Sequence, residues 1–442
     1  MPDDEERKPL TEINHRWAGR ALASGKVAAS AARLASRRLL GRAAGTTDGL
    51  IGESLARELD SMKGLAMKVG QILSYMEGVL PAETHEALRK LQRGAQPVAL
   101  ETLAPVIEEA LGRPLGELFD AIDPVAVAAA SIGQVHRAVH RGAPVAVKIQ
   151  YPRVRETLDA DFARLGALAR LASIATAVDG AALAEELRDR VLEECDYLRE
   201  ADHQDAFARA FAGDREIVIP EVIRERSAST VLTTRWHDGD DFYTFAEHAD
   251  RDRRSAAGLL LARFAYRSLF GLAAINADPH PGNYLFPRDG AVVFLDFGCV
   301  RRFEPSYVDI ERALTRVVIT GAREKFRDAL LATGMVPRPK KFDFDSHWAL
   351  LRHQWAPYTA PRFRFTFEYL REGLEYSKPD NPNLRHLAIP PPWIWQQRLQ
   401  FGLHAVLARL DAEADFREVL ESALDEPPRP LPQPGVVAGT ST

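Results

Sequence analysis

Apolar and polar residues alternate with a helical period in the first and last parts of the chain and with a strand period in the middle. From Leu50 to Pro124 apolar residues return every three or four positions, which predicts helices, including ones at Ala82–Arg93 and Leu100–Leu111. Beyond Arg302 the helical period resumes, with an interruption at Pro390–Pro392. Long helical segments around a strand-rich middle predict an α+β fold.

The middle part opens with a predicted β-hairpin. A β-rich run from Ala128 to Ala138 and a second from Pro144 to Gln150 flank the turn Arg141–Ala143, whose glycine suits a tight reversal. Three later runs alternate like strands, at Ile217–Pro220, Val222–Arg226 and Ser229–Trp236.

Helices and a second hairpin fill the rest of this region. Arg153–Ala212 predicts two long helices broken near Asp179-Gly180, and Trp236–Gly239 is interpreted as a hinge between two lobes. The remaining predicted elements are helices at Phe242–Ala249 and Asp252–Ile275, and strands Tyr284–Phe286 and Ala291–Leu295 around the turn Pro287–Gly290.

These patterns divide the chain into five segments. Residues 1–47 form a leader, 48–124 a helical extension, 125–238 a lobe that joins strands to a helical insert, and 239–425 a helical lobe. Residues 426–442 are rich in Pro and Gly, a composition typical of disorder.

Composition narrows the class of protein. The formal charge of −5 over 442 residues gives no reason to expect a nucleic-acid partner. Two cysteines, Cys195 and Cys299, indicate a reducing compartment. Cys299 is expected to be a small buried side chain, with a redox-sensitive or ligand-reactive thiol as the alternative. The longest apolar stretch, Leu259–Ile275, is interrupted by Arg263 and Arg267 and is too short to span a bilayer. We therefore expect a cytoplasmic protein, either soluble or peripheral on the inner face of a membrane.

The leader is basic. Ile13–Thr47 contains seven Lys or Arg and no acidic residue, interleaved with Ala, Leu and Trp17. Two interpretations stay open: an interfacial helix attracted to anionic lipid, or a solvated, partly disordered leader.

The candidate chemistry centres on Asp278, Asn283 and Asp296. Asp278 precedes Asn283 by five residues, and Asp296 follows thirteen later, after the second hairpin, in Asp-Phe-Gly. Phosphoryl transfer from a nucleotide needs a carboxylate beside the attacking oxygen, with an amide and a second carboxylate on Mg²⁺. The order matches the protein-kinase signature, which predicts ATP and Mg²⁺ as cofactors.

Two further features match that signature. Val145–Lys148 reads Val-Ala-Val-Lys, the strand motif whose lysine contacts the α- and β-phosphates and pairs with a helical Glu. Upstream, Ala128, Ala129, Ala130 and Ser131 occupy the place of the phosphate-covering loop, where alanine restricts the backbone more than glycine does. On a continuous helix Glu194 and Glu200 point about 120° apart, so one acid can meet Lys148 while the other serves a different partner.

Together these stretches resemble the UbiB (aarF-domain, or ADCK) atypical kinases over roughly Leu50 to Arg302. The motifs that carry the resemblance are Lys68-Val69-Gly70-Gln71, Ala128–Ser131, Val147-Lys148, Glu194-Cys195-Asp196 followed by Glu200, Asp278–Asn283 and Asp296-Phe297-Gly298. The resemblance implies a two-lobed protein-kinase-like fold with a helical N-terminal extension over the active site. It also implies ATPase or unorthodox kinase activity linked to ubiquinone and other isoprenoid lipids.

The resemblance also implies roles for single residues. Lys148 would contact phosphates and pair with Glu200, and Asp278 would act as base or orient water. Asn283 and Asp296 would hold Mg²⁺. Glu194 and Asp196 would face Lys68, which shares a helical face with Gln71. The helix that carries these two residues would block the groove for a peptide substrate. One position departs from the family, because many members have His where Asn276 stands.

Two other functions compete. Small-molecule kinases of the aminoglycoside or choline type use a similar loop and hairpin, but they lack the Lys68/Gln71 helix and the Ala-rich loop. A nucleotide-sensing pseudokinase that scaffolds other enzymes is the non-enzymatic alternative. Measuring ATP hydrolysis with and without quinone-precursor lipids would discriminate between them.

Overall fold

The computed structural model describes residues 98–130, 132–160, 162, 188, 192–377 and 381–432. It consists of two compact units. Among the described residues, unit 1 contains those as far as Ala201 together with Val222–Trp236, and unit 2 contains Asp202–Glu221 and those from His237 onward. The mixed α+β class is confirmed by the order of elements.

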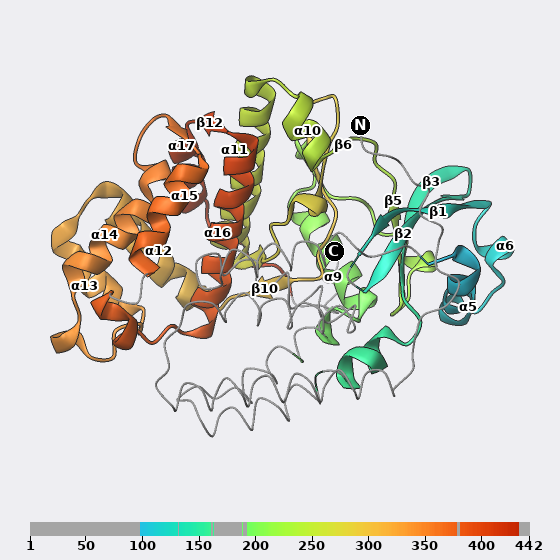
Figure 1. Cartoon of the computed structure of the whole chain (residues 1–442), viewed down its shortest axis with the longest axis horizontal. Helices are drawn as coiled ribbons and strands as arrows, with labels where there is room; N and C mark the ends of the chain where they lie inside the picture. Colours follow the sequence, from blue (N-terminus) through green and yellow to red (C-terminus); the bar gives the residue numbers. More distant parts are fainter. Residues whose placement is uncertain are drawn as a thin grey trace, which may run out of the picture. The chain divides into compact units, whose positions relative to one another are not determined.

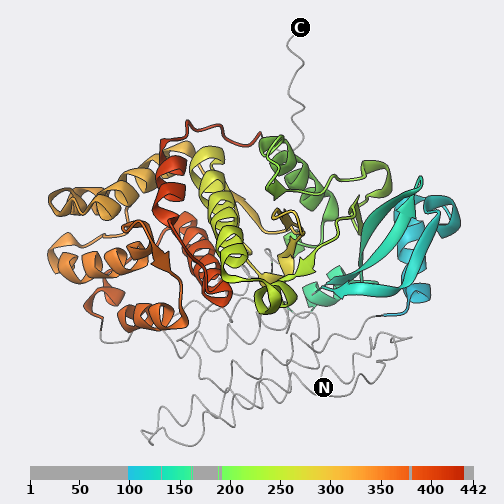
Figure 2. The same cartoon turned by 90° about the horizontal axis from the view of Figure 1, so that it is seen from above.

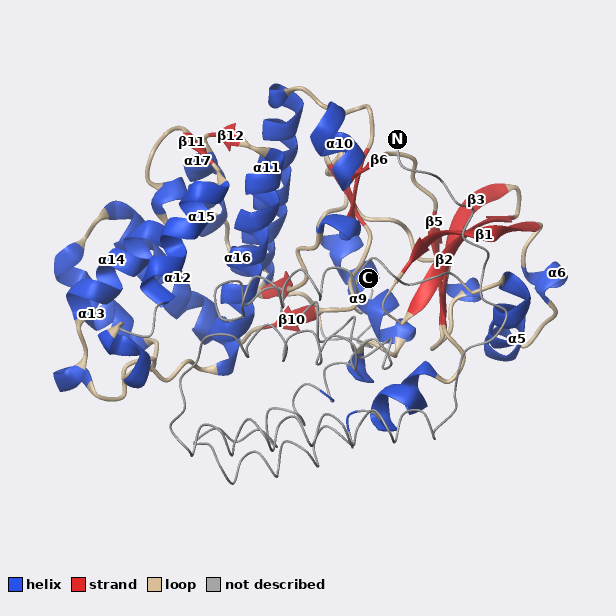
Figure 3. Ribbon diagram, in the orientation of Figure 1, coloured by secondary structure: helices blue, strands red, loops and turns tan. Residues whose placement is uncertain are grey.

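Unit 1 is built on an antiparallel sheet in the order β1-β2-β3-β5 (Figure 3). Its strands are β1 (Ala121–Ala129), β2 (Gly133–His140), β3 (Ala143–Gln150) and β5 (Val231–Arg235). The predicted hairpin is present as β2–β3, but its first strand begins at Gly133 rather than at Ala128, which belongs to β1. It reverses at Arg141 and Gly142, which both have positive φ (52° and 74°), the backbone that a two-residue hairpin loop requires.

Alternation along β3 builds the core of unit 1. Val145, Val147 and Ile149 are fully buried, and they cluster with Leu103 and Ile107 of α5 (Leu100–Leu111), whose bounds are those predicted. Figure 1 shows α5 and the short α6 (Leu115–Leu118) beside the sheet.

Three predictions for unit 1 are wrong at their ends. The helical pattern does not reach Pro124, since β1 begins at Ala121 and accommodates Pro124 in a register shift. Arg224–Arg226 form a 3₁₀ turn rather than a strand. The helix expected to carry Glu194 and Glu200 is broken at Glu194-Cys195, and α9 (Tyr197–Ala210) starts afresh. The 120° relation between these two acids therefore does not hold.

Unit 2 contains the second hairpin inside a small sheet. β8 (Tyr284–Phe286) and β9 (Val292–Phe294) pair antiparallel as predicted, flanked by β6 (Asp240–Asp241) and β4 (Ile217–Val218). Phe264 of α11 (Arg251–Tyr266) stacks on Phe294 with ring centroids 4.0 Å apart, which fixes the hairpin to the helical core.

The approach to the hairpin differs from the prediction. Instead of one helix to Ile275, α11 passes into a π-helical turn (Arg267–Gly271), and β7 (Ala274–Asn276) then pairs with β10 (Val300–Arg302). Ala273 has a φ of 49°, a backbone that no helix continues. The predicted helix at Phe242–Ala249 is present as α10 (Phe242–His248).

The rest of unit 2 is helical, as expected beyond Arg302. Pro391 starts a helix because proline suits the first helical position. Helices α11, α16 and α17 pack together (Figures 1 and 2). The helices are α12 (Pro305–Thr320), α13 (Arg323–Ala332), α14 (Phe344–Gln354), α15 (Phe367–Leu374), α16 (Pro391–Leu410) and α17 (Phe416–Asp425), and a two-stranded ribbon joins β11 (Phe363–Arg364) to β12 (Glu413–Ala414).

A buried carboxyl group links α12 to α16. Glu311 is 2% exposed, and its Oε1 accepts hydrogen bonds from Thr315 Oγ1, at 3.1 Å, and from Gln396 Nε2. The Gln396 side chain also accepts a hydrogen bond from Tyr307. Burial raises the pKa of Glu311 to about 8, so this side chain is protonated at neutral pH.

The predicted disorder of the tail is wrong for Glu426–Pro432, here called the C-terminal strap. Arg429 N donates to Gly271 O at 2.6 Å and Leu431 N to Leu272 O at 2.9 Å. Arg302 Nη1 donates to Leu431 O at 2.8 Å and to Pro432 O at 2.7 Å. These hydrogen bonds could not be predicted from the Pro-rich composition of the segment, because the partner residues lie in distant parts of the chain.

Several predictions lie outside the described residues. They include the basic leader, the helix at Ala82–Arg93, Lys68, Gln71 and residues 433–442. Of the helices that the structure describes, none combines the length and the hydropathy that crossing a bilayer would demand.

Candidate active site

Unit 1 contains a lysine–glutamate pair. Lys148 lies on β3, opposite Leu232 of β5, and its Nζ donates to Glu200 Oε1 at 2.7 Å and to Oε2 at 2.9 Å. Glu200 is 3% exposed and Lys148 is 17% exposed. Nζ also lies 4.9 Å from the ring centroid of Tyr197. The structure thus brings together the two residues that the resemblance paired, and burial makes that pairing necessary for both charges.

The turn before α9 is fixed to the sheet. Gln150 Nε2 donates to Cys195 O at 2.8 Å and to Ser229 O at 3.2 Å. Asp196 Oδ1 accepts from Leu198 N at 3.1 Å, a contact within the first turn of α9. Glu194 is half-buried, and the Lys68 partner predicted for Glu194 and Asp196 lies outside the described residues.

The small-residue loop is shorter than predicted. Ala128 and Ala129 are paired with β2, so they belong to the strand and not to the loop. Ala130 N donates to Gly133 O at 2.8 Å across the hairpin end, and Ser131 lies outside the described residues. A Cβ on Gly133 would come 2.2 Å from Ile149 O, so the backbone of β3 admits only glycine here.

Unit 2 supplies the loop with Asp278 and Asn283. Asn283 Nδ2 donates to Asp278 O at 3.0 Å and to Asp278 Oδ2 at 3.2 Å. Leu295 N donates to Asn283 O at 3.0 Å, which ties the loop to the end of the hairpin. The Asp278 side chain is 13% exposed, so it is held in a nearly closed environment.

Asn276 connects this loop to Asp-Phe-Gly. Its Nδ2 donates to Asp296 O at 2.5 Å, and its Oδ1 accepts from Asp278 N at 3.3 Å. The Asn276 amide therefore bridges the loop and Asp296. Phe297 is fully buried, 5.2 Å from Phe207 between ring centroids, and it anchors the segment.

The donor groups suit a hard cation that is also bound by phosphate. The Asn283 amide nitrogen donates to Asp278, so the amide oxygen Oδ1 is the atom of this side chain that would bind a cation. Asp296 Oδ1 accepts from Gly298 N at 2.9 Å, which fixes the orientation of the carboxylate. One carboxylate and one amide match the few protein ligands that Mg²⁺ takes beside phosphate. Among the described residues no group of three or more His, Cys, Asp or Glu forms a self-sufficient metal site.

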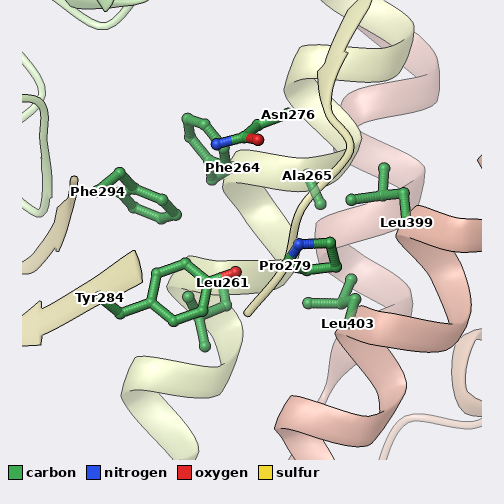
Figure 4. Close-up of a pocket in the computed structure, with 9 residues that line it drawn as sticks. All are labelled: Leu261, Phe264, Ala265, Asn276, Pro279, Tyr284, Phe294, Leu399 and Leu403. Atoms are coloured by element: carbon green, nitrogen blue, oxygen red, sulfur yellow. The ribbon is translucent and has the colours of Figure 1, made fainter. Parts of the chain in front are cut away.

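Sequence reasoning missed Arg398. This α16 residue donates from Nη2 to Asp278 Oδ1 at 2.9 Å and is 15% exposed. Beside it, Leu399 and Leu403 line a narrow pocket under the loop with Asn276 and Pro279 (Figure 4). No motif spacing relates residue 398 to residue 278, so only the fold reveals the contact.

Cys299 is buried, as expected. It is 5% exposed, and its backbone oxygen accepts from Ala277 N at 2.9 Å. Its backbone therefore helps to align the two segments that carry Asp278 and Asp296.

Comparisons with known proteins identify relatives of this chain. The sequence model described as "ABC1 atypical kinase-like domain" matches residues 90–328. An uncharacterized aarF domain-containing protein kinase of Arabidopsis thaliana, chloroplastic, is 33% identical over 55% of this chain and 35% of its own length. The mitochondrial atypical kinase COQ8B of Rattus norvegicus is 27% identical over 84% of this chain and 71% of its own length.

A solved structure shares the fold. It is the complex of Rv3197 with erythromycin from Mycobacterium tuberculosis, with a TM-score of 0.66 and 28% identity, covering 81% of this chain and 92% of that one. The first curated relatives are longer: the matched region spans 42%, 46% and 35% of their lengths.

Proposed function

The chain belongs to the ABC1 atypical kinase-like family, also called the UbiB or aarF family, and on that premise we propose an ATP- and Mg²⁺-dependent atypical kinase or ATPase. The proposed reaction is phosphoryl transfer or ATP hydrolysis that supports isoprenoid-quinone or lipid metabolism. The relatives named COQ8 atypical kinases support the quinone-related part of this proposal. The relatives named above do not favour the alternative of an aminoglycoside- or choline-type kinase.

The observation that carries the proposal is the buried pair of Lys148 and Glu200. A lysine with little access to water needs a compensating charge, and Glu200 provides it through both carboxylate oxygens. This arrangement holds the ammonium group in one place, ready for the phosphates of a nucleotide. A protein that merely displayed a surface lysine would not need a 3% exposed carboxylate beneath it.

In unit 2 the proposal assigns three roles. Asp278 accepts a proton from the attacking hydroxyl or orients a water molecule, held in orientation by the Asn283 amide. Asn283 and Asp296 would hold Mg²⁺, which supplies neutralisation of phosphate charge when bound. Asn276 keeps the backbone of Asp296 beside that of Asp278.

The proposal is tested with the full chain and labelled ATP. Hydrolysis and autophosphorylation are measured with and without Mg²⁺ and with vesicles that contain a quinone-precursor lipid. We expect turnover that requires Mg²⁺, rises with the lipid and disappears in Asp296→Asn. Asp289→Asn in the exposed hairpin turn is the matched control and should keep wild-type turnover.

Two results would contradict the proposal. Wild-type turnover no greater than that of Asp296→Asn would leave a nucleotide-binding scaffold, whose MgATP binding is then measured by calorimetry. Equal turnover with and without Mg²⁺ would remove the metal assignment of Asn283 and Asp296.

A second candidate function follows from the solved relative, whose structure is a complex with erythromycin. We propose macrolide binding as an activity to test beside the first. The melting temperature of the full chain is measured with erythromycin, with ATP and with both. An unchanged melting temperature at saturating macrolide would dismiss this candidate.

A further inference from the structure

We propose that Arg398 is a positioning residue for Asp278, supplied by a helix outside the matched kinase-like region. The inference rests on the proposed function, because it gives Asp278 a role in phosphoryl transfer. The family match ends at residue 328, whereas Arg398 lies on α16, which begins at Pro391. The C-terminal helices would then complete the active site rather than only extend the domain.

The first support is the geometry of the Asp278 carboxylate. Its Oδ1 accepts from Arg398 Nη2 at 2.9 Å, and its Oδ2 accepts from Asn283 Nδ2 at 3.2 Å. One oxygen is thus held by the loop itself and the other by α16. With both oxygens engaged, the carboxylate has one preferred orientation, which is what a group that must meet a proton or a water molecule requires.

The second support is burial. Arg398 and Asp278 are 15% and 13% exposed, so neither charge has its full hydration. A guanidinium group keeps its charge under such conditions and forms directed hydrogen bonds, which lysine does less well. Removing the arginine would leave a poorly hydrated carboxylate free to turn toward another donor.

The third support is the way α16 itself is fixed. Arg301 of β10 lies over the ring of Trp395, with its Cζ 4.4 Å from the ring centroid. Leu399 and Leu403 line the pocket under the loop together with Pro279 (Figure 4). The helix therefore contacts both the loop that carries Asp278 and the strand that follows Asp-Phe-Gly. Arg398 lies between these apolar and aromatic contacts in sequence, and its position is set by them.

Steady-state ATP hydrolysis by the full chain tests the proposal, with Arg398→Ala, Arg398→Lys and the exposed α16 control Arg409→Ala. We expect Arg398→Ala to lower kcat on the order of 100-fold, the loss that a misplaced group produces, while KM for ATP and MgATP affinity stay unchanged. Added guanidinium at millimolar concentration should restore part of kcat in Arg398→Ala only. The kcat of Arg398→Lys should lie between those of Arg398→Ala and the wild-type protein.

A second measurement does not depend on turnover. Amide hydrogen exchange in the peptide that contains Asp278 and Asn283 should accelerate in Arg398→Ala and stay unchanged in Arg409→Ala. Wild-type kcat in folded Arg398→Ala, or unchanged exchange in that peptide, would overturn the inference. If Arg398→Ala lowers kcat, MgATP affinity and melting temperature together, and guanidinium does not restore kcat, the inference is also overturned, because the arginine would then be purely structural. If the wild-type protein has no turnover while amide exchange is still faster in Arg398→Ala, the proposed function fails. Arg398 would then only stabilise the loop, and its role in positioning Asp278 for catalysis would be refuted.

Discussion

Replacing Glu311 by Gln should remove a large part of the pH dependence of stability in unit 2. Glu311 is fully buried between α12 and α16, and burial raises its pKa from the ordinary value of 4.5 to about 8. The folded protein therefore keeps a proton that the unfolded chain releases above pH 4.5. Stability from this group is complete below pH 4.5 and is lost as the pH rises towards 8.

The size of the effect follows from the shift. One pKa unit corresponds to about 1.4 kcal/mol, so between pH 5 and pH 7 the wild-type protein should lose about 2.5 kcal/mol of unfolding free energy through Glu311. A glutamine keeps an acceptor for Thr315 and Gln396 but has no proton to lose. The difference between wild type and Glu311→Gln should therefore change by that amount over this range.

Urea unfolding at several pH values measures the difference. Trp393 is a suitable fluorescent reporter because it is buried and its ring lies 5.0 Å from that of Tyr307, next to the cluster. Asp309→Asn, an exposed carboxylate on the same helix, is the control and should keep the wild-type slope. Subtracting the variants cancels other buried groups such as His404, whose pKa burial lowers to about 3. Parallel pH profiles for wild type and Glu311→Gln would refute the reasoning, since Glu311 would then be ionised in the folded protein.

Four other outcomes are expected. Glu200→Ala should cost about 3–5 kcal/mol in urea unfolding because it strands the Lys148 ammonium, and a Lys148→Met/Glu200→Ala double variant that is no more stable than the single one would argue against this cause. Gly133→Ala should destabilise unit 1 because its methyl group meets the Ile149 carbonyl, and an unchanged melting temperature would contradict that clash. Lys68→Ala should raise autophosphorylation in a labelled-ATP assay with Asp296→Asn as the blank, whereas no gain would identify Lys68 as a surface lysine. Deleting Met1–Gly45 should weaken binding to anionic vesicles, and salt should weaken binding of the intact chain, so equal binding by both proteins at low salt would exclude an interfacial leader.

Local patterns predicted the elements that depend on local contacts. The bounds of α5 and the presence of the two hairpins follow from periodicity and turn residues, because the forces that form them act within a few residues. The spacing of Asp278, Asn283 and Asp296 was readable for the same reason, since one loop and one hairpin carry all three.

Long-range contacts decided the elements that the sequence did not predict. The Glu194-Cys195 turn interrupts a helical pattern because Gln150 on a distant strand holds its backbone. The π-helical turn before β7 likewise has a partner far along the chain, because Arg312 Nη2 donates to the carbonyl oxygen of Phe270 in that turn. Arg398 is the extreme case, since 120 residues separate it from Asp278 and no local pattern marks it.

The C-terminal strap has a consequence for the order in which the protein can be completed during synthesis. Arg302, just after Asp-Phe-Gly, hydrogen-bonds to a residue 129 positions later, Leu431. At about 5–20 residues per second, a ribosome needs roughly 6–26 s to synthesise those 129 residues. Throughout that time the turn at Gly271 and Leu272 lacks its last hydrogen-bond partners. A nascent chain that already contains Asp278, Asn283 and Asp296 therefore still lacks these hydrogen bonds, and the packing of unit 2 around Gly271 and Arg302 depends on the C-terminal strap.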